Sequence, residues 1–527
     1  MVLTDFVLVI VSALLYALGL PNELLHYGNP VFGFIAIVPF LYVLYRQDRL
    51  SRTVLFGAVF ALISTVSVYF WLLFFQDFSI WTLSGVAAAH ILYFLVLAPI
   101  LFTALKYPPH IRPFLTAGVW VTYEFLKSTG YLGLPWGLLA HTSITFLPLI
   151  QISDITGQWG VSFLFALINT AILEILIDPK PLRRSLCGSS GRTAAFTLIL
   201  LILTLVYGTF SLKRSYPETA VLDAVLVQQN ADSWVAGNEM ESIRQGQVLT
   251  REALNSAAVK PDIIIWSENA FRYPYIKNSI RYRRNPTGDP FNSFLKEIDT
   301  PILIGSPYIL DPKTYSALNA VMLVNPEGDI LEYYGKTHPV PFAENIPFWN
   351  LSFVRAFFIK VLGIPSQGWN IGIPNIIFEI KNKGGESVSF GSPICFEDTF
   401  PYIARGFFKN GADILINLSN DSWSKTISGE TQHYAAALFR AVENRRTLVR
   451  STNAGVTVVI DPYGIGRNML PLFVSTAENV QIPVYRTAQT FYMRFGDWFP
   501  VVLLILLTSI QFYTIKTGNS LYGYRLK

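Results

Sequence analysis

Three residues in the C-terminal half of the chain carry the functional groups that nucleophilic catalysis requires: Glu268, Lys336 and Cys395. A cysteine thiolate can attack an acyl carbon, a carboxylate can take and return the proton, and an ammonium can stabilise the oxyanion that develops. A thiol with the ordinary pKa of about 8.5 is mostly protonated at neutral pH, so efficient attack needs a nearby base. Glu268 is the candidate for that base.

Each of these residues, taken singly, also has a structural interpretation. A free cysteine such as Cys395 is often just a small buried hydrophobe. Glu268 could be a carboxylate at a helix N-terminus, and Lys336 could be a surface charge. Because the three residue types together make a complete nucleophilic site, their combination favours the catalytic interpretation.

Short apolar runs around the three candidates predict the strands that would position them. Helical patterns lie between some runs, such as residues 432–446, in which Tyr434 and Leu438 share one face and Arg440 and Glu443 largely share another. Strands that alternate with helices indicate an α/β layered domain, and open sheets of this kind usually build their sites at strand ends. The strand-like runs lie at 262–268, 301–308, 320–325, 388–395 and 413–421.

The chain as a whole is too apolar for an ordinary soluble protein, since 52% of its residues are hydrophobic and 14% are charged. Apolar windows of about 20 residues suffice to cross a membrane, and they predict an α-helical bundle of eight transmembrane helices. We therefore expect a seven-helix transmembrane region (1–212), an α/β domain (213–495) and a C-terminal transmembrane helix with its tail (496–527). The windows lie near 4–20, 29–45, 53–75, 81–105, 113–127, 160–177, 194–212 and 499–515.

Basic residues in alternate connections orient the predicted spans. They follow the second, fourth, sixth and eighth windows, whereas connections 21–28, 76–80 and 128–159 contain neither Lys nor Arg. We expect both termini in the cytoplasm and the 213–495 domain outside, in the periplasm beyond a bacterial inner membrane. The first window lacks a basic flank and a cleavage site, which predicts a retained helix. The basic residues are Arg46, Arg49, Arg52, Lys106, Arg112, Lys180, Arg183, Arg184, Arg192, Lys516, Arg525 and Lys527.

This topology bears on the two cysteines and on the net charge. Cys187 falls in a predicted cytoplasmic loop and Cys395 in the outer domain, so the bilayer would forbid a disulfide between them. Cys395 is therefore expected to be an unpaired thiol. The formal net charge of +5 is due largely to loop arginines and calls for no nucleic-acid partner.

The order Glu–Lys–Cys, each residue in its local pattern, is similar to the carbon–nitrogen hydrolase (nitrilase) superfamily, whose fold is an αββα sandwich. Longer motifs are similar to the apolipoprotein N-acyltransferase family within it, and this resemblance covers most of the chain. They are "GLPWGLLAHT" (133–142), "PLIQISDITGQWGVSFLFALIN" (148–169), "GKTHPVPFAENIPF" (335–348), "PICFED" (393–398), "NLSNDSW" (417–423) and "QHYAAALFRAVENRRTLVRSTNAGVT" (432–457).

This resemblance implies a ping-pong acyl transfer without a cofactor or a metal. Cys395 would attack the sn-1 ester of a phospholipid and form a thioester, and Glu268 and Lys336 would act as general base and oxyanion stabiliser. The acyl chain would then pass to the α-amino group of the diacylglyceryl-modified N-terminal cysteine of a bacterial apolipoprotein. Both partners are lipids, so the site would lie at the membrane surface.

Further positions match the family one at a time. The resemblance implies an acyl-binding role for Trp234, a supporting role at the catalytic centre for Glu344, and a further required carboxylate at Glu397. The backbone N–H of Phe396 would be a second oxyanion donor. Without the resemblance, Trp234 would be assigned to packing and Glu344 to an exposed loop.

The sequence departs from the family pattern at three places. It reads "WSE" at 266–268 where "WPE" is common, has Phe396 where Tyr is frequent after the nucleophile, and reads "FAEN" where "FGEY" is more usual. None of these changes alters a reacting atom. The loss of the tyrosine hydroxyl removes any hydrogen bond from that side chain and leaves the backbone as the donor.

Two other functions remain open at this point. A membrane-tethered amidase or nitrilase would use the same triad, with water resolving the thioester. A transporter or scaffold with an inactive outer domain is a third possibility, and the intact Glu268, Lys336 and Cys395 argue against it.

Polar residues of the predicted bundle and one outer segment allow two interpretations each. Glu124 and Lys127 could neutralise each other, and His90 and Glu174 could simply be paired within the bundle, or these residues could contact a phospholipid headgroup. Segment 354–369 is apolar and basic enough to dip into the outer leaflet as a lid, and it could equally pack on the domain.

Overall fold

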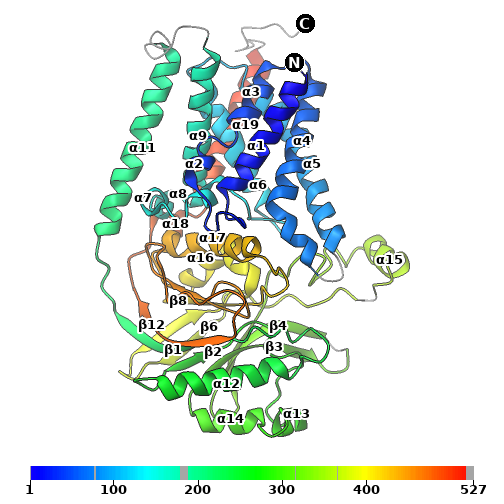
Figure 1. Cartoon of the computed structure of the whole chain (residues 1–527), viewed down its shortest axis with the longest axis vertical. Helices are drawn as coiled ribbons and strands as arrows, with labels where there is room; N and C mark the ends of the chain where they lie inside the picture. Colours follow the sequence, from blue (N-terminus) through cyan, green and yellow to red (C-terminus); the bar gives the residue numbers. More distant parts are fainter. Residues whose placement is uncertain (1, 76–78, 179–187, 315, 365, 518–527) are drawn as a thin grey trace.

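The computed structural model describes residues 2–75, 79–178, 188–314, 316–364 and 366–517. Its N-terminal half and its last helix form a helical bundle that stands on an α/β domain (Figure 1). The helices of the bundle are α1 (Val2–Gly19), α2 (Pro30–Gly33), α3 (Val38–Arg46), α4 (Leu50–Tyr69), η1 (Phe70–Phe74), α5 (Ser79–Ala104), α6 (Arg112–Lys127), η2 (Leu139–Ser143), α7 (Leu147–Ile150), α8 (Ser153–Thr156), α9 (Gln158–Ile177), α11 (Ser189–Lys213) and α19 (Trp498–Thr517).

Helices lie at all eight predicted windows, but five of the described helices are long and apolar enough to cross a membrane. The second window is not one continuous helix, because Pro39 near the start of α3 has no N–H to extend the turn before it. Eight spans therefore stay a prediction. The five helices are Val2–Gly19, Leu50–Phe74, Ser79–Ala104, Gln158–Ile177 and Ser189–Lys213.

Two six-stranded sheets with the same design form the centre of the α/β domain. Each has a parallel core of three strands, β1–β2–β3 and β7–β8–β9, with antiparallel strands outside it. The orders are β12-β1-β2-β3-β4-β5 and β11-β10-β9-β8-β7-β6. The strands are β1 (Ala220–Gln228), β2 (Ile263–Ile265), β3 (Ile302–Asp311), β4 (Ser316–Val324), β5 (Ile330–Gly335), β6 (Ile377–Lys381), β7 (Ser387–Gly391), β8 (Ile414–Ser419), β9 (Leu448–Thr452), β10 (Val458–Ile460), β11 (Gly466–Arg467) and β12 (Thr476–Val484).

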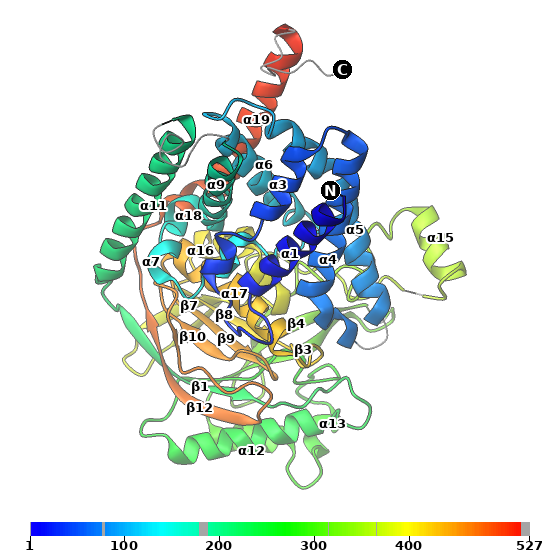
Figure 2. The same cartoon turned by 45° about the horizontal axis from the view of Figure 1, so that its top comes forward.

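Helices cover the outer faces of the two sheets, which gives the predicted layered sandwich. One helical layer lies on the side away from the bundle, and the other lies between the second sheet and the bundle (Figures 1 and 2). The first layer holds α12 (Glu241–Ser256), α13 (Ile280–Arg284) and α14 (Phe291–Ile298), and the second holds α16 (Pro401–Lys409) and α17 (Ile427–Asn444). Two further helices, α15 (Ser352–Lys360) and α18 (Phe491–Phe495), lie outside these layers.

The charged face predicted for α17 is buried rather than solvated. Arg440 and Glu443 are both 0% exposed and form an ion pair of 2.8 Å. Glu443 also accepts a hydrogen bond from the backbone N–H of Gln158, in the bundle, at 3.0 Å. The bundle therefore covers the polar side of α17, and these charged residues lie in the interface between the domain and the bundle.

His90 and Glu174 have partners within the bundle, as one of the two interpretations of the sequence expected. Glu174 forms an ion pair with Arg112 at 3.1 Å, and His90 contacts the Thr65 hydroxyl at 2.8 Å. Lys127 and Glu124 interact through their charges but form no direct ion pair, and the Nζ of Lys127 donates to the carbonyl oxygen of Trp136 at 2.6 Å. Cys187, Lys180, Arg183, Arg184, Arg525 and Lys527 lie outside the described residues, as does the side chain of Lys516.

Candidate active site

Cys395 begins a short helical turn, η3 (Cys395–Thr399), that follows the end of β7. Its φ of +50° lies in the left-handed region, which a non-glycine residue adopts at a cost and mostly at functional sites. The Asn417 side chain, at the end of β8, donates to the carbonyl oxygens of Cys395 at 2.9 Å and Pro393 at 3.1 Å. A neighbouring strand therefore fixes this strained turn.

Glu268 lies just beyond β2 and is 3% exposed. Its Oε1 accepts from the Asn319 side chain at 2.8 Å, and its Oε2 accepts from the backbone N–H of Asn420 at 2.8 Å. Burial raises the pKa of this carboxyl, and the nearby Lys336 ammonium opposes the rise. A raised pKa suits a group that must both take and return a proton near neutral pH.

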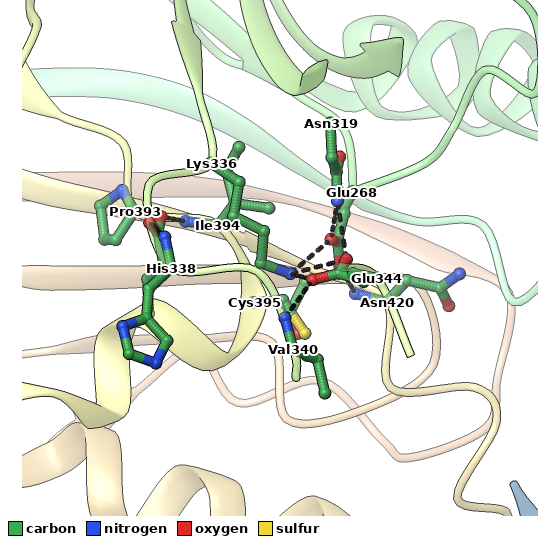
Figure 3. A network of polar contacts seen from close by, with 12 residues as sticks. Glu268, Asn319, Lys336, His338, Val340, Glu344, Pro393, Ile394, Cys395 and Asn420 are labelled. Carbon is green, nitrogen blue, oxygen red and sulfur yellow. Dashed lines mark hydrogen bonds and ion pairs between the residues drawn. The ribbon is translucent and has the colours of Figure 1, made fainter. Parts of the chain in front are cut away.

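Lys336 follows directly after β5 and is 1% exposed. Its Nζ lies 3.4 Å from Glu268 Oε1 and 2.9 Å from the Glu344 carboxylate. Burial alone would lower the pKa of Lys336, but the two carboxylates raise it well above the usual value. This lysine is therefore a permanent cation at the site (Figure 3).

The thiol of Cys395 points into the same cluster (Figure 3). Burial raises its pKa well above the ordinary value, and the negative charge of Glu268 adds to the rise. The resting thiol is therefore protonated at neutral pH, so attack on an acyl carbon requires a base. Glu268 and Lys336 supply a carboxylate and an ammonium from two other strand ends, which is the arrangement that the sequence predicted.

Glu344 lies on the loop after β5 and contacts the lysine directly. Besides the ion pair with Lys336, its carboxylate accepts from the Asn319 side chain at 3.0 Å and from the backbone N–H of Val340 at 2.7 Å. Asn319 thus bridges Glu344 and Glu268. These contacts fix the direction in which the Lys336 ammonium points.

Glu397 lies two residues beyond Cys395 but turns away from it. Its Oε1 accepts from the backbone N–H groups of Thr337 at 2.7 Å and His338 at 3.0 Å, and its Oε2 accepts from that of Ile394 at 2.8 Å. Tyr334 donates to both oxygens. The carboxylate therefore ties the loop that carries Lys336 to the turn that carries Cys395.

Phe396 packs against the bundle. Its ring stacks on Trp136, with centroids 5.2 Å apart and an interplanar angle of 13°. It also makes an edge contact with Phe400 at 4.7 Å. The aromatic ring at this position, which lacks the tyrosine hydroxyl common in the family, is thus part of a purely apolar contact between the domain and the bundle.

One cavity of about 2480 Å³ connects the three candidates to the bundle. Its wall includes Glu268, Lys336 and Cys395, and then continues along α5, α6 and α19 with mostly apolar side chains. Trp234 is 41% exposed on this wall, and the Arg272 guanidinium lies 4.0 Å from the centre of its ring. The space is long and apolar enough to accept hydrocarbon chains.

Segment 352–360 forms α15, which has no buried residue. It projects from the domain beside the lower ends of α4 and α5 (Figure 1). Phe353, Phe357 and Val361 are 71%, 50% and 66% exposed, whereas Phe358 and Leu362 line the cavity. The segment therefore presents apolar side chains both outward and toward the cavity.

Sequence reasoning assigned no role to a buried network beside the nucleophile. Asp421 Oδ1 lies 3.9 Å from Cys395 Sγ and 3.0 Å from His433 Nδ1, and His433 Nε2 lies 2.9 Å from Asp398. Arg450 pairs with both aspartates. Burial lowers the pKa of His433, but the aspartates raise it to about 9. The motifs quoted for residues 393–398, 417–423 and 432–457 contain all four residues, and they were the available signal.

Comparisons with known proteins bear on both parts of the chain. Residues 12–171 match the family described as apolipoprotein N-acyltransferase N-terminal domain, and residues 225–473 match carbon-nitrogen hydrolase. Apolipoprotein N-acyltransferase 2 of Treponema denticola is 40% identical over 95% of this chain and 96% of that protein. Apolipoprotein N-acyltransferase of Borreliella burgdorferi is 33% identical over 98% and 97%. The crystal structure of Saccharomyces cerevisiae Nit3, a nitrilase-superfamily member, shares 20% identity over 51% and 93%, with a TM-score of 0.36.

Proposed function

Because the chain belongs to the apolipoprotein N-acyltransferase family, we propose that this membrane enzyme moves an acyl chain from a phospholipid to a bacterial apolipoprotein through a thioester on Cys395. The acceptor is the α-amino group of the diacylglyceryl-modified N-terminal cysteine. The observation that carries this proposal is the single cavity in which Glu268, Lys336 and Cys395 adjoin an apolar wall of the bundle. A site for water-soluble amides would not need such a wall.

In the first half-reaction, Glu268 accepts the thiol proton while Cys395 Sγ attacks the sn-1 ester carbonyl. The oxyanion that forms is stabilised by the Lys336 ammonium and by the backbone N–H of Phe396. When the intermediate collapses, the ester C–O bond breaks and Glu268 returns the proton to the glycerol oxygen. A lysophospholipid leaves, and the acyl chain stays on Cys395 as a thioester.

In the second half-reaction, the acceptor amine attacks the thioester carbonyl. Glu268 takes a proton from the attacking nitrogen, the C–S bond breaks, and the proton returns to the cysteine sulfur. Glu344 keeps the Lys336 ammonium in place during both steps, and Glu397 holds the two loops together. Trp234 contributes an exposed aromatic surface to the part of the cavity that receives the acyl chain.

The fusion of the domain to a bundle follows from the chemistry of the two substrates. Each methylene kept out of water is worth about 0.8 kcal/mol, so neither lipid leaves the bilayer easily. We place the 1–212 region and the 496–527 segment in the bacterial inner membrane with eight spans, both termini cytoplasmic and the 213–495 domain periplasmic. In this arrangement the apolar side chains of α15 dip into the outer leaflet.

A labelled phospholipid tests the nucleophile. The purified protein, given a phospholipid with a labelled sn-1 chain, should form an adduct on Cys395 that neutral hydroxylamine cleaves. Cys395→Ser should give no such thioester, whereas Cys395 variants that retain hydroxylamine-sensitive label would disprove the assignment. Adding a diacylglyceryl peptide with a free N-terminal cysteine should yield triacylated peptide. Release of free fatty acid alone would favour the membrane-tethered amidase or nitrilase.

A further inference from the structure

Besides Lys336, the cations on the wall of the catalytic cavity include Lys127, Arg272 and Lys425, and Lys127 is the buried one of these three. The reaction steps above do not use it. Lys127 ends α6 and is 3% exposed. Its Nζ donates to the carbonyl oxygen of Trp136 at 2.6 Å. Among the described residues, no carboxylate oxygen lies within 4.0 Å of that nitrogen. Glu124, one turn earlier, acts on this ammonium only through its charge beyond that distance, and a buried ammonium is held best by a direct anionic partner.

The neighbouring carboxylate does not reach Lys127, and one of its two oxygens is engaged elsewhere. Glu124, one turn earlier on α6, accepts from the Trp120 indole at 3.0 Å and from the backbone N–H of Leu139 at 2.8 Å. An ammonium has three donors, and Lys127 uses one of them for Trp136. The residue therefore keeps donor capacity for an acceptor that enters the cavity.

One aromatic stack also connects Lys127 to the turn that carries Cys395. Trp136, whose carbonyl oxygen it holds, stacks its ring on Phe396, the residue that follows the nucleophile. Lys127, Trp136 and Cys395 all line the same cavity. Lys127 and Cys395 therefore border the same ligand space.

We propose that Lys127 binds the phosphate diester of the phospholipid donor and thereby sets the sn-1 carbonyl before Cys395. This inference depends on the proposed function and names the donor subsite of the same cavity. The phosphate and the sn-1 ester belong to one glycerol unit. Binding of the phosphate therefore restricts the positions that the ester carbonyl can take. Phosphate oxygens accept charge-assisted hydrogen bonds from lysine. The apolar wall along α5, α6 and α19 takes the acyl chains.

The test compares two labelled donors that differ only in the phosphate: a phospholipid and the diacylglycerol with the same chains. For the phospholipid, Lys127→Met should lower the kcat/KM of thioester formation by about 10- to 100-fold, the range expected for a lost charge-assisted hydrogen bond. Diacylglycerol should react at nearly the same rate with the wild type and with Lys127→Met. Lys127→Arg should retain most of the phospholipid reaction.

Lys106→Met is the matched control, because Lys106 also donates to a backbone carbonyl, that of Tyr45 at 2.8 Å, without lining the cavity. It should leave both donors unaffected. Equal loss with both donors in Lys127→Met would show a structural role through Trp136 and overturn the proposal, as would no loss with the phospholipid.

Inorganic phosphate in the assay separates a lipid phosphate from a free anion. We expect little competition at millimolar phosphate, because the acyl chains supply most of the affinity for a lipid. Strong competition that disappears in Lys127→Met would mean that the site binds free anions and would overturn the lipid assignment. Failure of the wild type to form any thioester would instead contradict the proposed function, so the two failures are distinguishable.

Discussion

At the scale of single residues, the site works through the charge of one lysine. Two carboxylates raise the pKa of Lys336 even though its burial would lower it, so the ammonium persists over the whole physiological range. The same ammonium opposes the rise in pKa that burial imposes on Glu268. If Glu268 is the base as proposed, its protonation, rather than loss of the lysine charge, sets the acid limit of the reaction.

The pH dependence of thioester formation follows from these shifts. The kcat/KM should fall as the pH drops through the pKa of Glu268, at a pH above the ordinary glutamate value of about 4.3. The charge of Glu344 contributes to this raised pKa, so Glu344→Gln should move the acid limb to lower pH. Rates measured from pH 4 to 9 check both statements.

Glu332→Gln is a suitable control for this series, because Glu332 lies on β5 with an exposed side chain. The Glu332→Gln variant should show the acid limb of kcat/KM at the same pH as the wild type. An acid limb that stays in place in Glu344→Gln would show that Glu344 does not act on Glu268 through its charge.

At the scale of elements, the proposed reacting groups come from the ends of β2, β5 and β7, and polar side chains tie those ends together. The Glu397 carboxylate accepts hydrogen bonds from backbone N–H groups of the loop after β5 and of the turn after β7. His433 on α17 is held between Asp421, after β8, and Asp398, within the nucleophile turn. Two buried polar side chains, Glu397 and His433, therefore hold these strand ends in place relative to one another.

Replacement of Glu397 by Gln tests the first contact. A glutamine has one acceptor oxygen in place of two, so at least one of the three backbone N–H groups from Thr337, His338 and Ile394 loses its partner. Each buried unsatisfied group costs about 1–3 kcal/mol. We expect kcat for thioester formation to fall by about tenfold or more, with the acid limb unchanged. A wild-type kcat in this variant would contradict the positioning role.

The His433 contact should appear in the pH dependence of stability. Its pKa is raised from about 6.5 to about 9, so the charged form stabilises the fold fully below the lower value and less as the pH rises through the higher one. The free energy of unfolding of the wild type should decline between about pH 6.5 and 9, by up to ~1.4 kcal/mol per pH unit from this group, and the thermal midpoint should fall with it. His433→Gln should be less stable at pH 7 and lack that part of the decline. Parallel curves of thermal midpoint against pH for the wild type and His433→Gln would contradict a stabilising charge on His433.

Many of the strands that hold the site could be predicted from the sequence. The runs before Glu268 and after Asp413 are buried on both faces, so a short continuous apolar pattern was enough to predict β2 and β8. The partners of His433 lie 12 and 35 residues before it and meet it only when the end of β8, the Cys395 turn and α17 pack together, which no local pattern encodes. The break between α2 and α3 was missed because hydropathy does not register the missing N–H of Pro39.

At the scale of the whole molecule, the domain and the bundle share a buried polar interface. The side of α17 opposite the second sheet contacts the bundle, and Arg445 at its end is 1% exposed. Arg445 Nη2 lies 2.9 Å from Asp154 Oδ2 and 3.1 Å from the Ser211 hydroxyl, in α8 and α11. The same guanidinium donates to the carbonyl oxygens of Gln151 at 2.9 Å and Pro462 at 3.0 Å. One arginine thus joins three parts of the chain, so the domain is held to the bundle by more than the linkers at its ends.

Arg445→Met tests whether this contact holds the two parts together. The variant leaves Asp154 buried without its cation, and the loss of one partner from a buried pair costs about 3–5 kcal/mol. We expect a clearly lower thermal midpoint in detergent and easier proteolysis between the bundle and the domain. Arg486→Met removes an ion pair with Asp413 in which the arginine side chain is 40% exposed, and it should cost less than about 1 kcal/mol. Similar shifts in the two variants would mean that Arg445 contributes no more than a surface ion pair and does not hold the domain to the bundle.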